Sequence, residues 1–385
     1  MSLPPDLAGL LSPPQDFDAR PVVEWLIRMA ADAGASDLHL RPSEGMVEVL
    51  TRVDGVLAEQ LQLPGEIYER LLVGLKNMAR VQSFRKSTPQ DGRLSVDGCE
   101  VRLSTGPSHF GEKAILRLVR PGQQLPALDE LGLEQSQLRR WQTILRQPQG
   151  LVLATGPAGS GKTTTLYASL RWLWEGQARW LGPRQGARLN VVTLEDPVEV
   201  VLPEFTQTPL QPAAGMTFAT GLRSLLRQDP DVILVGEIRD PETASASVQS
   251  SLSGHLVLST VHARDSVGVV PRLLELGVEP YLLSAALGGV IYQRLVRRLC
   301  SCHNQGRAVG CPHCHASGYR GRLALAEVLS VNENLRQGIL DRLPLARLRQ
   351  LGQDTGMVPL VEAARSLVKE NQTSVDEVQR CVGSY

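Results

Sequence analysis

The sequence predicts an α/β protein with two domains, a small α+β domain followed by a larger domain built on a doubly wound parallel sheet. In the first part, alternating runs such as Met46–Val53 end in turn signals, here Asp54-Gly55, which is typical of antiparallel hairpins. In the second part, continuous apolar runs such as Val232–Val235 alternate with helical patterns, which is typical of buried parallel strands. The 385 residues, 42% of them hydrophobic, suffice for two ordinary cores.

The small α+β domain is expected to span residues 21–120. Residues 1–20 contain Pro4-Pro5 and Pro13-Pro14 and are predicted to be a disordered lead-in. Within the domain, apolar residues at helical spacing predict helices, and alternating runs predict strands. We expect helices over Val22–Ala33 and Ile67–Val81, and strands over Ser36–Leu40, Met46–Val53, Arg93–Val96, Glu100–Ser104 and Lys113–Leu118.

A polar, proline-containing segment at residues 121–130 is predicted to be the linker, and residues 131–385 form the second domain. Residues Glu175–Asn190 are interpreted as an insertion in a connection, with nearby tryptophans as packing residues. The expected strands of this domain are Gln149–Ala154, Leu189–Leu194, Val232–Val235 and Leu256–Ser259, and its C-terminal part from Val331 to Val382 is expected to be helical.

Composition and charge exclude several classes of protein. Lysine plus arginine and aspartate plus glutamate number 40 each, so the net charge does not favour a protein that coats nucleic acid or membrane. The N-terminus lacks the basic start and apolar run of a signal peptide, and no stretch reaches the about 18 apolar residues of a membrane span. We therefore expect a cytoplasmic protein that meets its partners through local sites.

A glycine-rich loop is the strongest motif. GPAGSGKT matches G-x-x-x-x-G-K-[ST], follows an apolar strand and precedes a helix. Its backbone N–H groups can surround phosphate oxygens, Lys162 can reach the β- and γ-phosphates, and the Thr163 hydroxyl can ligate Mg²⁺. The motif predicts that ATP and Mg²⁺ are bound by Gly156, Pro157, Ala158, Gly159, Ser160, Gly161, Lys162, Thr163 and Thr164.

An acidic residue at a strand end distinguishes hydrolysis from simple nucleotide binding. Glu237 follows the buried run Val232–Val235, which places its carboxylate at the sheet edge beside the glycine-rich loop. There it can bind Mg²⁺ or its waters and orient the attacking water. Glu237 is the predicted catalytic carboxylate.

Two further polar clusters are expected at strand ends of the same domain. LEDPVE contains Glu195, Asp196 and Glu199, and GHLVLSTVH contains His255 and His262. Carboxylates and imidazoles at the carboxyl ends of parallel strands can contact a γ-phosphate or relay protons. We count Glu195 and His262 among the candidate catalytic residues.

Four of the six cysteines are concentrated in one short segment, as Cys300-x-Cys302 and Cys311-x-x-Cys314. Four thiolates can complete a tetrahedral zinc site, and His303 can replace Cys302 as a ligand. Because no general base accompanies the cluster, the predicted Zn²⁺ is structural.

From about Ser36 to the C-terminus, the chain resembles the secretion ATPases of the GspE, PulE and PilB group, which serve type II secretion and type IV pilus assembly. The resemblance is carried by the glycine-rich loop, an aspartate-rich box with Glu195, a Walker B region with Glu237 and a histidine box with His262. SDLHLRP, RVDG, QDGR and VRLSTGPSHFGEKAILRL in the first domain agree as well, and so does SGYRGR after the cysteines. The resemblance implies a RecA-like P-loop NTPase domain preceded by a small PAS-like α+β domain.

The resemblance also implies roles that the residues alone do not show. It implies that arginines of the small domain, by motif Arg102 and Arg117 and more weakly Arg93, approach the γ-phosphate at a hexamer interface. The chain departs from the family pattern in two ways. Its first cysteine pair is C-x-C instead of C-x-x-C with a shorter loop to the second pair, and it resembles a short form that lacks the first N-terminal domain.

The expected function is therefore that of a hexameric ATPase motor for pseudopilus or pilus assembly. We expect it to associate with the inner membrane through a platform protein and not to bind nucleic acid directly. The alternatives are a nucleotide-gated scaffold with negligible turnover and a motor for pilus retraction or DNA uptake. The cysteine cluster argues against a retraction motor, because retraction members of the group normally lack it.

Overall fold

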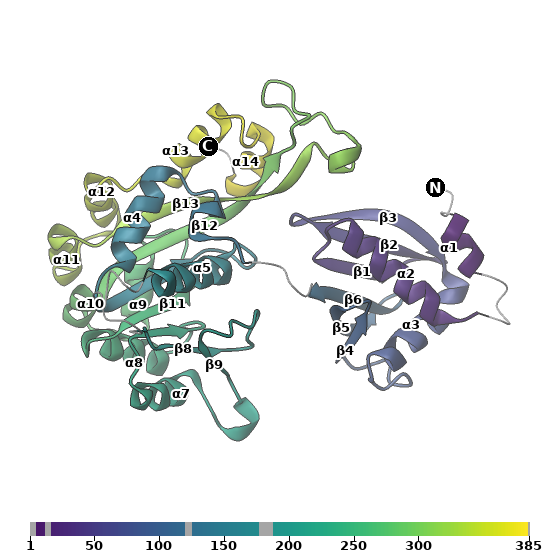
Figure 1. Cartoon of the computed structure of the whole chain (residues 1–385), viewed down its shortest axis with the longest axis horizontal. Helices are drawn as coiled ribbons and strands as arrows, with labels where there is room; N and C mark the ends of the chain where they lie inside the picture. The colour runs from purple at the N-terminus through teal and green to yellow at the C-terminus, as the bar shows by residue number, and fades with distance from the viewer. Residues whose placement is uncertain (1–4, 12–16, 120–124, 177–187, 384–385) are drawn as a thin grey trace. The chain divides into compact units, whose positions relative to one another are not determined.

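The computed structural model describes residues 5–11, 17–119, 125–176 and 188–383 and separates into two compact units (Figure 1). The first unit comprises Met1–Gln124 and the second Leu125–Tyr385. Residues 121–124 of the expected linker lie outside the described residues. The rest of the linker prediction is wrong, because Leu128–Leu131 form a 3₁₀ turn whose Leu128 is buried in the core of the second unit.

The first unit is an antiparallel sheet covered by helices, in agreement with the predicted α+β class. Within the described residues the strand order is β3-β2-β1-β6-β5-β4. Alternation places Val101 and Leu103 of β5 in the core with α2 and α3, while Arg102 and Ser104 lie on the opposite face. Its elements are α1 (Pro5–Leu10), α2 (Ala19–Asp32), β1 (Asp37–Pro42), β2 (Met46–Val53), β3 (Val56–Pro64), α3 (Gly65–Met78), β4 (Gln90–Val96), β5 (Cys99–Ser108) and β6 (Gly111–Val119).

Two local features show how the sequence determines this unit. Asp54 and Gly55 form the predicted two-residue turn between β2 and β3, both with positive φ, of 48° and 83°. The prediction of a disordered lead-in is wrong for residues 5–11. Proline is tolerated in the first turn of a helix, so Pro5 can begin α1, and the fully buried Leu7 anchors this helix to the core.

The second unit is a mixed sheet with helices on both faces, as predicted for a doubly wound domain. In its described part the order is β13-β12-β7-β11-β10-β8-β9, and only the pair β12 and β13 is antiparallel. Its strands are β7 (Gly150–Thr155), β8 (Val191–Glu195), β9 (Thr206–Pro209), β10 (Val232–Val235), β11 (Leu256–Val261), β12 (Leu287–Leu299) and β13 (Tyr319–Ser330). Its helices are α4 (Gln135–Leu145), α5 (Lys162–Glu175), α7 (Phe218–Leu225), α8 (Pro241–Leu252), α9 (Val269–Glu275), α10 (Pro280–Ala286), α11 (Glu333–Leu340), α12 (Leu345–Asp354), α13 (Leu360–Lys369) and α14 (Val375–Val382).

Side chains of the central strand β7 alternate between two cores. Leu151 and Leu153 pack with α7 to α11, whereas Val152 and Ala154 pack with α4 and α5. Trp172 and Trp174 pack against the second of these cores, as expected, and Trp180 lies outside the described residues. No helix in the described ranges combines the length and the apolar character that a membrane crossing requires.

The strand pair β12 and β13 was not predicted from the sequence. β12 pairs in parallel with β7 as far as Tyr292 and then continues beyond the end of β7, still paired with β13, up to the cysteine segment. Arg294, Arg297 and Arg298 therefore lie on a strand. These residues belong to the part of β12 that extends beyond β7, where the chain is less buried and tolerates charge.

Candidate active site

The glycine-rich loop joins β7 to α5 at the carboxyl edge of the second unit's sheet. β7 is buried along its whole length, and the loop follows it directly. Gly156, Gly159 and Gly161 have φ angles of 143°, 71° and 85°, which residues with side chains rarely adopt. The loop can therefore turn backbone N–H groups inward, and the first turn of α5 supplies further unpaired N–H groups.

Lys162 begins α5, and its ammonium group lies across this loop. Its Nζ donates to the carbonyl oxygens of Gly156 at 3.0 Å and Pro157 at 2.9 Å. Burial lowers the pKa of Lys162, while the carboxylates of Glu237 and Glu199 act in the opposite direction. Both carboxylates are thus close enough to influence the ammonium group. This combination of a glycine cradle, a cation and nearby carboxylates fits ATP with Mg²⁺.

Glu237 lies just beyond β10 at the same sheet edge, where the neighbouring strand holds the backbone. The Thr260 hydroxyl of β11 donates to the carbonyl oxygen of Gly236 at 2.8 Å. The Glu237 side chain is 15% exposed, forms an ion pair with Arg239, and places Oε2 3.9 Å from Nε2 of His262. A carboxylate and an imidazole in this arrangement can act on one water molecule.

The two histidines of GHLVLSTVH lie at opposite ends of β11. Val261 pairs with Thr155 at the loop end of β7, so His262 follows at the carboxyl edge, with its side chain 59% exposed. His255 precedes the strand and its Nδ1 is 3.0 Å from the carbonyl oxygen of Ser250. The prediction that His255 reaches the phosphate edge is wrong, because a strand of six residues, about 20 Å long, separates it from that edge.

Glu195 is a buried group with protein partners. Its carboxylate accepts hydrogen bonds from the hydroxyls of Tyr167 and Thr193, the latter at 2.5 Å, and from the side-chain amide of Gln207 at 3.2 Å. Burial and the Glu195 carboxylate raise the pKa of Tyr167, so this phenol stays protonated and donates. Glu195 therefore fixes the end of β8 against α5, whereas Glu199 nearby is exposed to solvent.

Residues missed by the sequence analysis complete this edge. Arg239 pairs with Glu237, Tyr167 holds Glu195, and the Thr155 hydroxyl accepts from the N–H of Ala263 in the loop after His262. Arg239 stands two residues after the predicted catalytic carboxylate, Glu237, which was a usable signal. No sequence signal marked Tyr167 or Thr155, because their contacts depend on the order of the strands in the sheet.

The arginines predicted to approach phosphate lie side by side on the sheet of the first unit. The register places Arg102 opposite Arg93 on β4 and opposite Arg117 on β6. Arg117 donates to Asp37 at 3.0 Å, whereas neither Arg93 nor Arg102 has an ion-pair partner among the described residues. The three neighbouring guanidinium groups concentrate positive charge on this face of the sheet. Like charges at directly opposite positions repel, so a negatively charged group bound here would relieve the repulsion.

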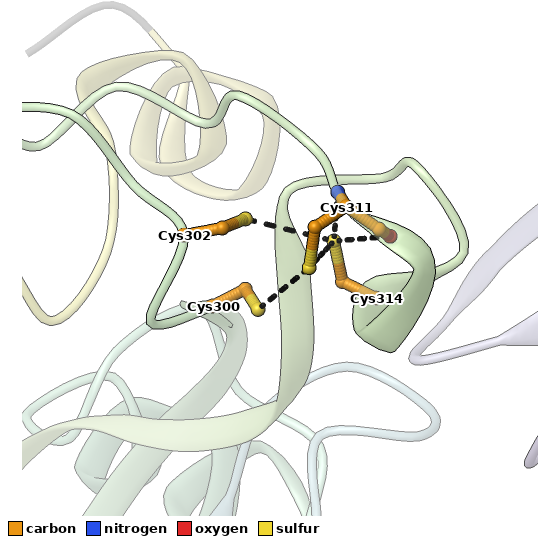
Figure 2. A group of neighbouring side chains, drawn as sticks. All are labelled: Cys300, Cys302, Cys311 and Cys314. Atoms are coloured by element: carbon orange, nitrogen blue, oxygen red, sulfur yellow. Dashed lines mark hydrogen bonds between the residues drawn. The ribbon is translucent and has the colours of Figure 1, made fainter.

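The four clustered cysteines converge on one point (Figure 2). All four Sγ atoms lie within 4.8 Å of one another, and three measured pairs are 3.7 to 3.9 Å apart. A tetrahedral Zn²⁺ with Zn–S bonds of about 2.3 Å would place its sulfurs about 3.8 Å apart, so the C-x-C pair fits. His303 is not part of the group, and its Nδ1 accepts from the N–H of Gly306 instead.

Backbone N–H groups prepare one of these thiols for a metal. Burial acts to raise the pKa of Cys314, but hydrogen bonds from the N–H groups of Cys311 and Gly318, at 3.1 and 3.2 Å, outweigh it and hold the pKa at about 6. A thiolate is the form that ligates Zn²⁺. The cluster has the donor set of a closed structural zinc site.

Residues 16–380 match the family described as type II/IV secretion system protein. The chain belongs to this family. Among curated relatives, the type IV pilus assembly ATPase TfpB of Acinetobacter baylyi is 38% identical over 94% of this chain and 65% of its own length. The type II secretion system protein HxcR of Pseudomonas aeruginosa is 38% identical over 98% of this chain and 80% of its own length. The resemblance inferred from the motifs is confirmed.

Two solved structures share the fold of this type II/IV secretion family chain. The ATPase DotB of Legionella pneumophila has a TM-score of 0.71 at 21% identity, covering 96% of this chain and 97% of DotB. The pilus retraction motor PilT has a TM-score of 0.64 at 24% identity, covering 93% of this chain and 96% of PilT. The predicted architecture, a doubly wound α/β domain preceded by a small α+β domain, is thereby confirmed as the fold.

Proposed function

We propose that this chain is an ATP-hydrolysing motor subunit that powers pseudopilus or pilus assembly in a type II secretion or type IV pilus system. The observation that carries the proposal is the meeting of Lys162, Glu237 and His262 at one sheet edge, next to the glycine-rich loop. Relatives named as type II secretion and type IV pilus assembly proteins support the biological setting.

Glu237 orients and activates the attacking water. Its carboxylate is mostly buried, and the Thr260 hydroxyl of β11 holds the backbone at Gly236 just before it, so the position of Glu237 is fixed before the nucleotide binds. His262, 3.9 Å away, can hold the same water or accept a proton from it. Arg239 forms an ion pair with the same carboxylate.

Lys162 and the loop neutralise the charge of the transferred phosphoryl group. When ATP arrives, Nζ can exchange its two carbonyl partners in the loop for phosphate oxygens, a stronger charge-assisted bond. Thr163 and Glu237 would hold Mg²⁺ directly or through its waters. The ion supplies charge neutralisation between the β- and γ-phosphates.

An arginine of the first unit supplies further positive charge to the nucleotide. Arg102 fits this role better than Arg117, because Asp37 already neutralises Arg117. The row of arginines would give ATP a preference for one arrangement of the two units, and loss of phosphate would release it. Work on a membrane platform protein would come from this cycle in a homo-oligomer, expected to be a hexamer in the cytoplasm at the inner membrane.

The test is Mg²⁺-dependent ATP hydrolysis by the full chain, measured together with its oligomeric state by light scattering. We expect Glu237→Gln to abolish hydrolysis, because it removes the charge that orients the attacking water. Glu242→Gln, an exposed residue of α8, is the matched control and should behave like the parent. Binding of ATP without turnover by the parent chain would refute the motor and favour a nucleotide-gated scaffold.

A further inference from the structure

A buried glutamine of β12, Gln293, forms a hydrogen bond to the glycine-rich loop. Gln293 lies in β12, is 1% exposed, and donates from Nε2 to the carbonyl oxygen of Ser160 at 2.6 Å. The backbones of the loop and of β12 also approach closely at this point. A methyl group at Gly156 would lie 2.3 Å from the carbonyl oxygen of Gln293, so only glycine fits there. The loop therefore rests directly on β12 at this residue.

This hydrogen bond determines the direction of one peptide of the loop. In a trans peptide the C=O and the following N–H point in opposite directions. Because Gln293 draws the C=O of Ser160 toward β12, the N–H of Gly161 is turned away from β12. Gly161 has a φ of 85° and caps α5, so this N–H lies among the donors that surround a phosphate.

Two polar atoms at the same place point to a function beyond packing. The Oε1 atom of Gln293 and the hydroxyl of Ser160 are both buried, and neither has a hydrogen-bond partner within the described part of the chain. A buried polar atom without a partner is costly, so an apolar side chain of the same shape would suit a purely structural role better. A glutamine is useful here because its amide specifies the orientation of the peptide.

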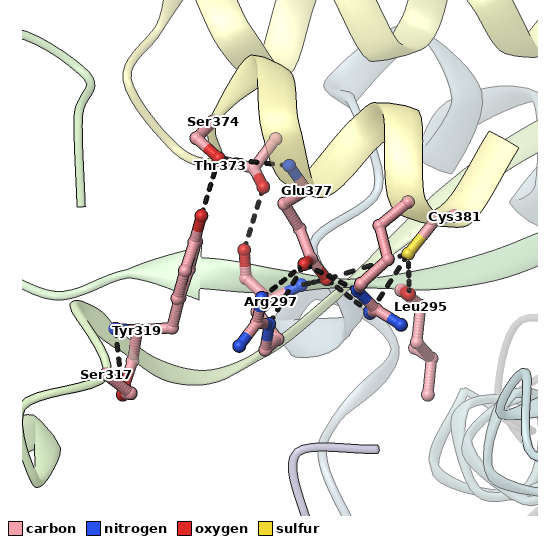
Figure 3. A network of polar contacts seen from close by, with 9 residues as sticks. Leu295, Arg297, Ser317, Tyr319, Thr373, Ser374, Glu377 and Cys381 are labelled. Atoms are coloured by element: carbon pink, nitrogen blue, oxygen red, sulfur yellow. Dashed lines mark hydrogen bonds and ion pairs between the residues drawn. The ribbon is translucent and has the colours of Figure 1, made fainter. Parts of the chain in front are cut away.

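The strand that carries Gln293 is itself firmly fixed a few residues later (Figure 3). Glu377 of α14 accepts hydrogen bonds from the Arg297 backbone N–H at 2.9 Å and from its guanidinium at 2.7 Å. The Thr373 hydroxyl donates to the carbonyl oxygen of Arg297 at 2.8 Å. β12 thus offers the loop a base that is anchored to the C-terminal helices.

We propose that Gln293 is a positioning residue for nucleotide binding, which holds the Ser160–Gly161 peptide with its N–H toward the phosphates of ATP and ADP. This role rests on the proposed ATPase function. Gln293 touches no reacting atom, so its removal weakens binding of the nucleotide and leaves the rate of the bound state nearly unchanged.

The experiment compares two buried glutamines that make the same kind of bond. Gln137 of α4 is 4% exposed and donates from Nε2 to the carbonyl oxygen of Ala326 at 2.7 Å, and its hydrogen bonds within the described residues go to Ala326 and Glu134, not to the loop. Gln293→Met and Gln137→Met each remove one buried amide at nearly constant volume. Their thermal unfolding midpoints therefore show whether the two changes disturb the fold to a similar degree.

We expect Gln293→Met to raise the Kd for Mg-ADP, measured by calorimetry, about tenfold, which corresponds to about 1.4 kcal/mol. The KM for ATP should rise by the same factor with kcat changed less than twofold, and Gln137→Met should change neither. Gln293→Glu should weaken binding further, because its carboxylate faces the Ser160 carbonyl oxygen. If the methionine variant does not fold, Gln293→Asn replaces it in this experiment. Asparagine keeps the amide on a side chain too short to reach Ser160, so the same rise in the Kd for Mg-ADP is expected.

Unchanged ADP affinity in Gln293→Met overturns the proposal and leaves the ATPase function standing. An equal loss in Gln137→Met also overturns it, since the effect would then be a general loss of packing. A parent chain that neither binds ADP nor hydrolyses ATP would overturn the proposed function itself.

Discussion

Replacement of Glu377 by glutamine should destabilise the second unit by about 3 kcal/mol at pH 7. The Glu377 side chain is fully buried and accepts from both Arg297 and Arg380. Burial acts to raise the pKa of Glu377, but the hydrogen bonds from Arg380 and Arg297 outweigh it and hold the pKa at about 2. A displacement from 4.5 to about 2, at about 1.4 kcal/mol per unit, corresponds to about 3 kcal/mol, which agrees with the cost of breaking a buried ion pair.

The same argument fixes the pH dependence of this effect. Because the pKa is lower in the folded state, the stabilisation is complete above the unfolded pKa near 4.5 and is lost as the pH falls toward 2. The difference between parent and Glu377→Gln in the free energy of unfolding should therefore shrink by about 1 kcal/mol between pH 7 and pH 4.

Urea unfolding followed by circular dichroism at both pH values measures this difference, with Glu370→Gln as the matched control. Glu370 is exposed and lies in the same region, so its replacement should change stability by less than about 0.5 kcal/mol. A loss below about 1 kcal/mol in Glu377→Gln at pH 7, or one equally large at pH 4, would refute the reasoning.

Three further results are expected. Arg102→Ala should lower kcat for ATP by about tenfold or more with little change in ADP affinity, whereas Arg20→Ala on the helical side of the same unit should change neither; equal effects would exclude a specific role. We expect mass spectrometry to detect one Zn²⁺ in the parent chain and none in Cys314→Ser, and a parent purified without zinc would contradict the site. Tyr167→Phe leaves the buried Glu195 short of one donor and should destabilise the second unit by about 1 to 3 kcal/mol, as measured by urea unfolding; a change below about 0.5 kcal/mol would mean that Gln207 and Thr193 suffice.

The site was predictable from the sequence where its chemistry is local. The glycine-rich loop with Lys162 is one contiguous segment, and Glu237 follows a run that can only be a buried strand. Gln293 was not predictable, because it meets Ser160 from 133 residues away through the pairing of β12 with β7. No periodicity marks such a residue.

The fold was predictable to the same extent and for the same reason. Strands enclosed on both faces appear as apolar runs, as β10 does with Val232–Val235. β12 escaped prediction because its second half extends beyond β7 and carries arginines such as Arg297. α1 escaped it because one buried leucine, Leu7, is too little pattern for a helix of six residues.

The length of β12 has a mechanical consequence. Its 13 residues extend about 40 Å from a position beside β7 to the loop between β12 and β13 that carries Cys300 to Cys314, here called the cysteine hairpin. A tilt of about 5° at the inner end would move the outer end by about 3 to 4 Å, so the strand acts as a lever. Val309 in the hairpin is 61% exposed and can carry a fluorescent label without disturbing a core. A label there would magnify changes at the nucleotide loop that are too small to follow at the loop itself.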